Sequence, residues 1–232
     1  MAPGAQWSVR GVGEELGLNG DVMETAMPKA RGAWLALACI ALWLAAAAGA
    51  RLLGIWLAIG GTSVALGFTV LAVDRATARR FLRPNPELIL LGAAAGGFMA
   101  AATYLVYPAL SRLFPFVVTD TARLYAEFRA PSLLIASVAL APIVLGEELV
   151  WRGAVQTSLA QRLGPRGGVV LSAVAYGLAH APLGSALLVA VALLCGLAWG
   201  GLRATTASLI PALVAHLVWD VLVLFWLPLD SR

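Results

Sequence analysis

Two adjacent acidic residues, Glu147 and Glu148, lie in a stretch of sequence that is otherwise typical of a membrane-spanning helix. Arg152 follows four residues after Glu148, and every other residue of 133–151 is apolar, small or proline. A charged side chain at the centre of a bilayer costs about 2.5–3.5 kcal/mol even on insertion scales. We therefore expect these side chains to face a polar cavity inside the protein and to act there.

The chain has only two histidines, His180 and His216, and both fall in apolar segments. Tyr176 precedes His180 by four residues, and Asp220 follows His216 by four. Residues at this spacing share one face of a helix, so each pair is predicted to point in the same direction. Glu148 and Arg152 share a face in the same way, while Glu147 is turned about 100° away.

These residue types together suit hydrolysis. A carboxylate and an imidazole can hold a water molecule and remove its proton, and a second polar group can stabilise the oxyanion that forms at a carbonyl. Arg162, Arg166 and Arg203 are assigned to connections between spans. The ionisable candidates that remain from residue 132 to 227 are Glu147, Glu148, Arg152, His180, His216 and Asp220.

Structural roles are the alternatives at several of these positions. Glu148 and Arg152 can form an ion pair within one helix, and Tyr176 can pack or donate a hydrogen bond. Asp220 can simply orient His216. An active site is favoured because both histidines occur in predicted spans, and these spans carry a single glutamate pair.

The composition identifies an integral membrane protein. Of the 232 residues, 61% are hydrophobic and only 12% are charged, against about 25% charged in soluble domains. The net charge of +4 does not indicate a nucleic-acid partner, because the basic residues flank apolar segments as membrane-flanking residues do. Cys39 and Cys195 lie in apolar segments and are expected to be buried thiols, not a disulfide or a metal site.

The predicted fold is all-α, a polytopic transmembrane bundle with a catalytic core made by the last four helices. A span needs about 20 residues, and the apolar runs predict seven spans: 33–50, 52–73, 88–107, 132–151, 168–182, 184–202 and 205–227. With these boundaries Glu147 and His180 are predicted at different depths. The Ala, Gly, Leu and Arg bias is typical of a GC-rich bacterial genome, so the expected location is a bacterial cytoplasmic (inner) membrane.

Three regions are predicted along the chain. Residues 1–32 are polar and mixed in charge, typical of a cytoplasmic tail, and residues 33–131 form an N-terminal transmembrane region whose connection, 108–131, carries an amphipathic helix on the outer face. Residues 132–232 form the core. The basic loop of Arg75, Arg79, Arg80 and Arg83 places this connection in the cytoplasm, and seven spans then place the C-terminus outside.

Three motifs together resemble one known family. Glu147-Glu148-x-x-x-Arg152, Tyr176-x-x-x-His180 and His216-x-x-x-Asp220 are similar in order and spacing to the motifs of the CPBP family, also called Abi. This family comprises intramembrane CAAX proteases and bacteriocin-processing enzymes. The resemblance covers residues 132–227 and implies an intramembrane endopeptidase.

The resemblance also implies roles. Glu147 and His180 would activate the water, His216 and Asp220 would line the oxyanion site, and Glu148 with Arg152 would hold the helices. It implies a peptide or protein substrate, lipidated or not, membrane lipid as a further partner, and a cavity that opens to the cytoplasm.

Two positions depart from the family pattern. Tyr176 stands where phenylalanine is usual, and Asp220 stands where the eukaryotic enzymes have asparagine. An ionised aspartate cannot donate a hydrogen bond to an oxyanion. Asp220 is therefore protonated, orients His216, or serves another role.

Three other interpretations stay open. Two histidines and two carboxylates could bind zinc, although the His-Glu-x-x-His signature is absent, and the expected enzyme is metal-independent without a cofactor. A catalytically silent bacteriocin-immunity or scaffold protein could keep the same fold. A proton-coupled transporter also uses intramembrane Glu, His and Asp, but no inverted repeat is evident.

Overall fold

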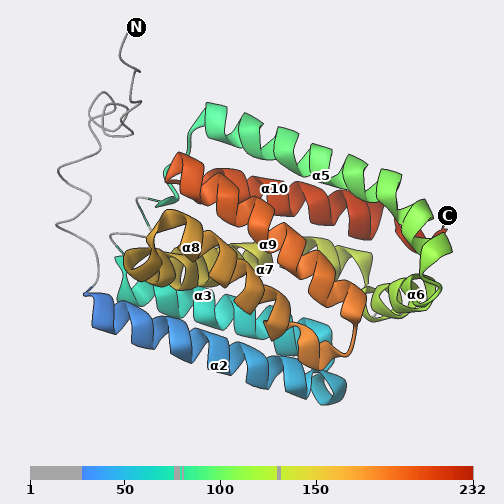
Figure 1. Cartoon of the computed structure of the whole chain (residues 1–232). Coiled ribbons are helices and arrows are strands. Elements are labelled where there is room, and N and C mark those ends of the chain that lie inside the picture. The colour runs from blue at the N-terminus through green and yellow to red at the C-terminus, as the bar shows by residue number, and fades with distance from the viewer. Residues whose placement is uncertain (1–27, 76–78, 80, 130–131, 232) are drawn as a thin grey trace, which may run out of the picture.

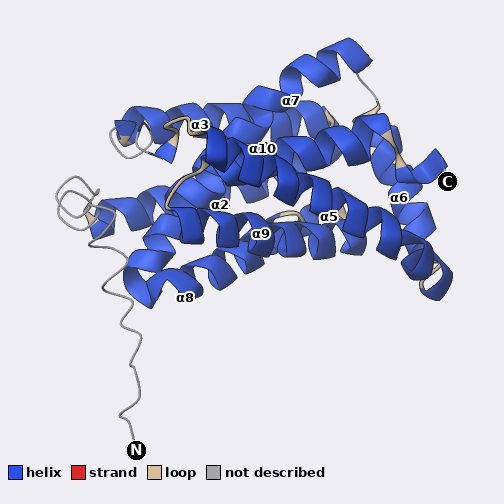
Figure 2. Cartoon of the chain, turned by 90° about the horizontal axis from the view of Figure 1, so that it is seen from above, coloured by secondary structure: helices blue, strands red, loops and turns tan. Residues whose placement is uncertain are grey.

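The computed structural model describes residues 28–75, 79, 81–129 and 132–231, and over these residues the chain is helical without a strand (Figures 1 and 2). The predicted all-α class is confirmed. The elements in chain order are α2 (Lys29–Leu53), η1 (Trp56–Gly60), α3 (Gly61–Val73), α5 (Pro86–Leu113), α6 (Phe116–Phe128), α7 (Leu133–Glu148), η2 (Leu149–Val155), α8 (Gln156–Ala179), η3 (Ala181–Leu183), α9 (Ala186–Thr206), α10 (Ile210–Asp220), η4 (Val221–Trp226) and η5 (Leu229–Ser231).

Within the described part of the chain, five helical stretches are long and apolar enough to cross a membrane. They are Lys29–Leu53, Trp56–Val73, Pro86–Leu113, Leu134–Leu183 and Ala186–Thr206, and Ile210–Trp226 is a shorter apolar helix. Many large apolar side chains on the outside of the bundle are exposed, among them Leu52 at 91% and Leu105 at 82%. A soluble protein rarely exposes so much apolar surface, and the chain is a polytopic helical membrane protein.

Several helices begin where the sequence supplies a cap. Asn85 accepts hydrogen bonds from the amides of Glu87 and Leu88, and Pro86 occupies the first helical position of α5. Ser132 caps α7 through the amide of Ile135. Such side chains satisfy the first amides of a helix, which have no partner inside it.

The predicted spans 132–151 and 168–182 are two arms of one helical hairpin. The helix that contains the glutamate pair does not end at Trp151 but continues through η2 and α8 to Gly164, where φ is 76° and ψ is 170°. Only glycine adopts this conformation readily, and Pro165 favours extended backbone before it. A Cβ atom built on Gly168 would lie 2.7 Å from the Cβ atom of Ala160, so the chain folds back on itself.

Other predicted boundaries shift by a few residues. Helix α2 begins at Lys29, inside the predicted tail of 1–32. The first 27 residues of that tail lie outside the described residues, and so does Arg80 of the predicted basic loop. Helix α2 ends at Leu53, before Gly54 with a φ of 77°. Arg203 is not in a connection but in the last turn of α9, where its guanidinium lies 4.3 Å from the ring centre of Phe81.

The amphipathic helix predicted within 108–131 is α6, which lies across one end of the bundle (Figure 1). Its buried side chains are Val117, Thr121, Leu124 and Tyr125. The hydroxyl of Tyr125 donates to the carbonyl of Val223 in η4 and accepts from the amide of Leu229 at 3.2 Å. These bonds join α6 to the C-terminal segment.

Close helix contacts through glycine bring the elements of the site together. A Cβ atom on Gly146 would lie 2.1 Å from the carbonyl oxygen of Ser63 in α3, and one on Gly67 would lie 2.6 Å from the Cα atom of Gly146. A Cβ atom on Gly96 of α5 would lie 2.6 Å from the carbonyl oxygen of Ala215 in α10. Small residues allow such contacts in membrane bundles, and here they lie beside Glu147 and His216.

Candidate active site

The hairpin brings the first two sequence motifs to one depth. Glu147 lies 17 residues before Gly164, and His180 lies 16 residues after it. Arg152 and Tyr176 are each 12 residues from Gly164, and the Arg152 guanidinium carbon lies 4.6 Å from the Tyr176 ring centre. The predicted difference in depth between Glu147 and His180 is therefore wrong, because the first arm extends about a dozen residues beyond Trp151.

A buried charged cluster forms the inner part of the site. Arg152 Nη1 lies 3.1 Å from Glu148 Oε1, as the i, i+4 spacing predicts. The same oxygen lies 2.9 Å from Nδ1 of His216. Glu148 is completely buried and Arg152 is 2% exposed, so this cluster joins the hairpin to α10 away from solvent.

Aromatic rings surround the cluster, and sequence reasoning missed most of them. The ring of Trp199 stacks on His216 with 3.7 Å between the ring centres. The Arg152 guanidinium carbon lies 5.0 Å from the Trp199 ring centre, and Trp151 and Trp43 form an edge-to-face pair at 5.4 Å. Cation–π contacts of a desolvated guanidinium contribute about 2 kcal/mol. All three tryptophans lie in apolar segments, where nothing in their spacing marks them.

Glu147 points to a different neighbour, as the 100° rotation predicts. Its Oε2 atom accepts a hydrogen bond of 2.7 Å from the hydroxyl of Tyr176. Tyr176 thus donates to Glu147 and also packs against its aromatic neighbours. Glu147 is 8% exposed, so its carboxylate is more accessible than that of Glu148.

His180 lies at the end of α8 beside Tyr176. The two rings meet edge to face with 4.7 Å between their centres. Nδ1 of His180 lies 2.8 Å from the carbonyl oxygen of Tyr176, so Nδ1 carries the proton in the neutral ring. The lone pair is then on Nε2, which can accept a proton.

His216 and Asp220 share a face of α10, as predicted. Nε2 of His216 lies 3.5 Å from Oδ2 of Asp220, while Nδ1 faces Glu148. Both ring nitrogens thus face carboxylate oxygens, which suits an imidazolium with two N–H donors. The contact agrees with the interpretation that Asp220 orients His216.

A π-helical segment, η2, follows the glutamate pair directly. Wide turns of this kind shift the register of a helix and occur often at functional sites. Arg152 and Trp151 lie in η2 and are both buried. The segment therefore sets the direction of Arg152 relative to the glutamates.

The zinc interpretation concerns the same histidines and carboxylates. Among the described residues, no three or more His, Cys, Asp and Glu side chains are arranged to hold one. Both nitrogens of His216 face carboxylates, and Nδ1 of His180 faces a carbonyl. Cys39 and Cys195 are free and buried, as predicted, and the site is built without them.

Fold and site define a polytopic membrane protein with glutamate, histidine and aspartate side chains gathered inside a helical bundle. Residues 128–222 match the family described as type II CAAX prenyl endopeptidase Rce1-like. The chain thus carries a domain of the Rce1-like CAAX endopeptidase (Abi/CPBP) family over these residues, which confirms the resemblance. No curated protein and no solved structure matches the chain.

Proposed function

We propose that the protein is an intramembrane endopeptidase that hydrolyses a peptide bond with a water molecule activated by Glu147 and His180. The observation that carries the proposal is the meeting of the three motifs: Tyr176 contacts both Glu147 and His180, and Glu148 contacts His216. The family implies a protease with a protein substrate. The roles of individual residues are our inference.

Glu147 and His180 are the groups best suited to hold the water. Glu147 is more exposed than the fully buried Glu148, and its carboxylate is fixed by the Tyr176 hydroxyl. Nε2 of His180 carries the lone pair when Nδ1 donates to the Tyr176 carbonyl. As the water oxygen attacks the carbonyl carbon, one of the two bases takes its proton and the C=O electron pair moves to oxygen. Cleavage of the C–N bond then requires return of a proton to the leaving nitrogen.

His216 is the group best suited to stabilise the oxyanion. Asp220 is 8% exposed, while Glu148 is fully buried, so the Asp220 side of the imidazole is the more accessible one. A protonated His216 presents an N–H on that side, and donors fixed in place are effective at a developing negative charge. Asp220 then orients this N–H, and it need not itself donate to the oxyanion.

We propose seven membrane crossings, with both arms of the hairpin and Ile210–Trp226 each crossing once. In Figure 1 the beginning of α2, the bend in α8 and the start of α10 lie at one end of the bundle. Basic residues occur in or next to these segments in the sequence: Lys29 and Arg31 at the start of α2, and Arg162 and Arg166 beside Gly164. The positive-inside rule then places this end in the cytoplasm. The opening of the site to the cytoplasm stays a prediction from the resemblance.

The test is cleavage of a labelled peptide library, with and without attached prenyl groups, by purified protein in lipid nanodiscs. Glu147→Gln and His180→Gln should each lower the rate by at least about a hundredfold, while Glu127→Gln, an exposed glutamate of α6, should not. A zinc chelator should leave cleavage unchanged. Full activity of Glu147→Gln would refute the assignment, and loss on chelation with recovery on adding zinc would favour a metalloprotease.

A further inference from the structure

The turn that follows His180 is part of the same backbone unit as the histidine. The His180 carbonyl accepts a hydrogen bond of 3.1 Å from the amide of Leu183, and the Ala181 carbonyl accepts one of 2.9 Å from Gly184. Gly184 has a φ of 75°, a left-handed conformation that favours glycine. A displacement of this turn therefore displaces the His180 backbone.

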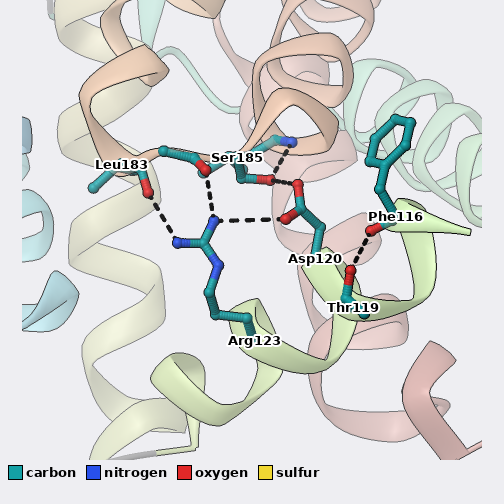
Figure 3. A network of polar contacts seen from close by, with 8 residues as sticks. Phe116, Thr119, Asp120, Arg123, Leu183 and Ser185 are labelled. Atoms are coloured by element: carbon teal, nitrogen blue, oxygen red, sulfur yellow. Dashed lines mark hydrogen bonds and ion pairs between the residues drawn. The ribbon is translucent and has the colours of Figure 1, made fainter.

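Helix α6 holds this turn from outside through Arg123 (Figure 3). Arg123 Nη2 donates to the carbonyl of Gly184 at 2.9 Å, and Nη1 donates to the carbonyl of Leu183 at 3.4 Å. A rigid guanidinium can bind two neighbouring carbonyls at once, whereas an ammonium acts as a point charge. Arg123 therefore fixes both position and direction of the turn.

Asp120, one turn before Arg123, holds the other side of the connection. Its Oδ2 accepts a hydrogen bond of 2.7 Å from the Ser185 hydroxyl, and Ser185 Oγ in turn accepts the amide of Leu188 at 3.1 Å as the cap of α9. Asp120 Oδ1 also lies 3.8 Å from Arg123 Nη2. Asp120 and Arg123 thus form a clamp on the connection between α8 and α9. The clamp reaches from the carbonyls of Leu183 and Gly184 to Ser185, the cap of α9.

We propose that Asp120 and Arg123 are positioning residues that set the orientation of the His180 imidazole through this turn. The inference rests on the proposed function, in which His180 activates water. The clamp contacts backbone and a capping side chain, not the reacting groups. The Arg123 side chain is 42% exposed, so replacing it leaves the buried part of the bundle intact.

The end of the same helix supplies a matched control. Arg129, the residue directly after α6, binds both oxygens of Asp230 at 2.7 and 2.8 Å, near the C-terminus and away from the turn. Arg123→Gln and Arg129→Gln each remove one guanidinium from this part of the chain. Only the first removes donors from the turn after His180.

Kinetics and NMR of the full chain in nanodiscs test the proposal together. A misplacement of about 1 Å can cost a hundredfold in rate, so Arg123→Gln should lower kcat about tenfold to a hundredfold. KM should stay within about twofold, since substrate contacts are unchanged. Arg123→Lys should recover part of the rate, and Asp120→Asn should lower kcat less than Arg123→Gln, because its amide oxygen still accepts from Ser185.

The two histidines make the NMR readout simple. A sample labelled at histidine gives two imidazole signals, assigned with single histidine variants. Arg123→Gln should move the His180 signal and leave His216 in place, and Arg129→Gln should move neither. An unchanged His180 signal, or an unchanged kcat in an active enzyme, would overturn the proposal. Absence of any cleavage by the wild type would refute the proposed function, while the His180 signal would still decide whether the clamp acts on the imidazole.

Discussion

Replacing Glu148 by glutamine is expected to destabilise the fold much more than the same change at Glu147. Removing one member of a buried ion pair costs about 3–5 kcal/mol, because the remaining charge has no partner. In Glu148→Gln, the Arg152 guanidinium loses its charged partner and keeps the ring faces of Tyr176 and Trp199, which predicts a loss near the upper value. In Arg152→Met, Glu148 keeps the His216 contact of 2.9 Å, which predicts a loss near the lower value.

The double variant Glu148→Gln/Arg152→Met separates the pair from its surroundings. No unpaired charge of the pair is left in it, so its loss of unfolding free energy should be smaller than the sum of the single losses by about 2–3 kcal/mol. Unfolding in detergent, followed by tryptophan fluorescence, measures all three variants. In Glu147→Gln the amide oxygen can still accept from Tyr176, so the expected loss is under about 1.5 kcal/mol. Additivity of the single losses within about 0.5 kcal/mol would refute the idea that the two charges stabilise each other.

Three other predictions use the same unfolding and cleavage assays. Gly96→Ala should destabilise the protein and lower cleavage, because its Cβ atom would lie 2.6 Å from the Ala215 carbonyl oxygen beside His216, whereas Gly97→Ala meets nothing within 4 Å and should have little effect; equal effects would contradict the packing argument. Tyr176→Phe keeps the ring packing but loses the 2.7 Å hydrogen bond to Glu147, so cleavage should fall while stability changes by only about 1–2 kcal/mol, and an unchanged rate would show that Glu147 needs no such support. Burial raises the pKa of Tyr125 to about 12 from an ordinary value of 10. The neutral phenol therefore stabilises the fold fully below about pH 10, and this contribution is lost as pH rises through 12. Tyr125→Phe should lose less stability than the wild type between pH 10 and 12, and an identical pH dependence would exclude Tyr125 as the source of the loss.

The i, i+4 contacts of the site were predictable because they depend only on helix geometry. Glu148 with Arg152 and His216 with Asp220 both form as expected. The contact of Glu148 with His216 joins residues 68 positions apart and depends on how α7 and α10 pack, which no periodicity of the chain specifies. The stacking of Trp199 on His216 was missed for the same reason. A tryptophan in an apolar span is common, and only the packed structure shows that Trp199 contacts the His216 imidazole and the buried Arg152 guanidinium.

The predicted end of the fourth span at Trp151 is wrong, because the helix continues through a more polar segment. Gln156, Arg162 and Arg166 lower the hydropathy of the segment after Trp151, and hydropathy alone therefore ended the span there. The side chain of Gln156 is nevertheless buried and donates to the carbonyl of Gly200 at 2.9 Å. Polar residues that find partners inside a bundle do not end a helix. The Gly164-Pro165 dipeptide was the better guide to the true turn, because its backbone requirement is local.

The Gly164 turn also explains why the first two motifs can serve one site. Two antiparallel arms bring together residues at equal distances from the turn, as Ala160 meets Gly168 and Arg152 meets Tyr176. Each residue added to one arm shifts later side chains by about 1.5 Å and turns them by about 100°. The number of residues between Glu147 and His180 is therefore constrained, although neither of the two motifs includes this spacing. His180 must also be held at the far end of its arm, where α8 has already ended, and it is there that Arg123 and Asp120 of α6 contact the chain.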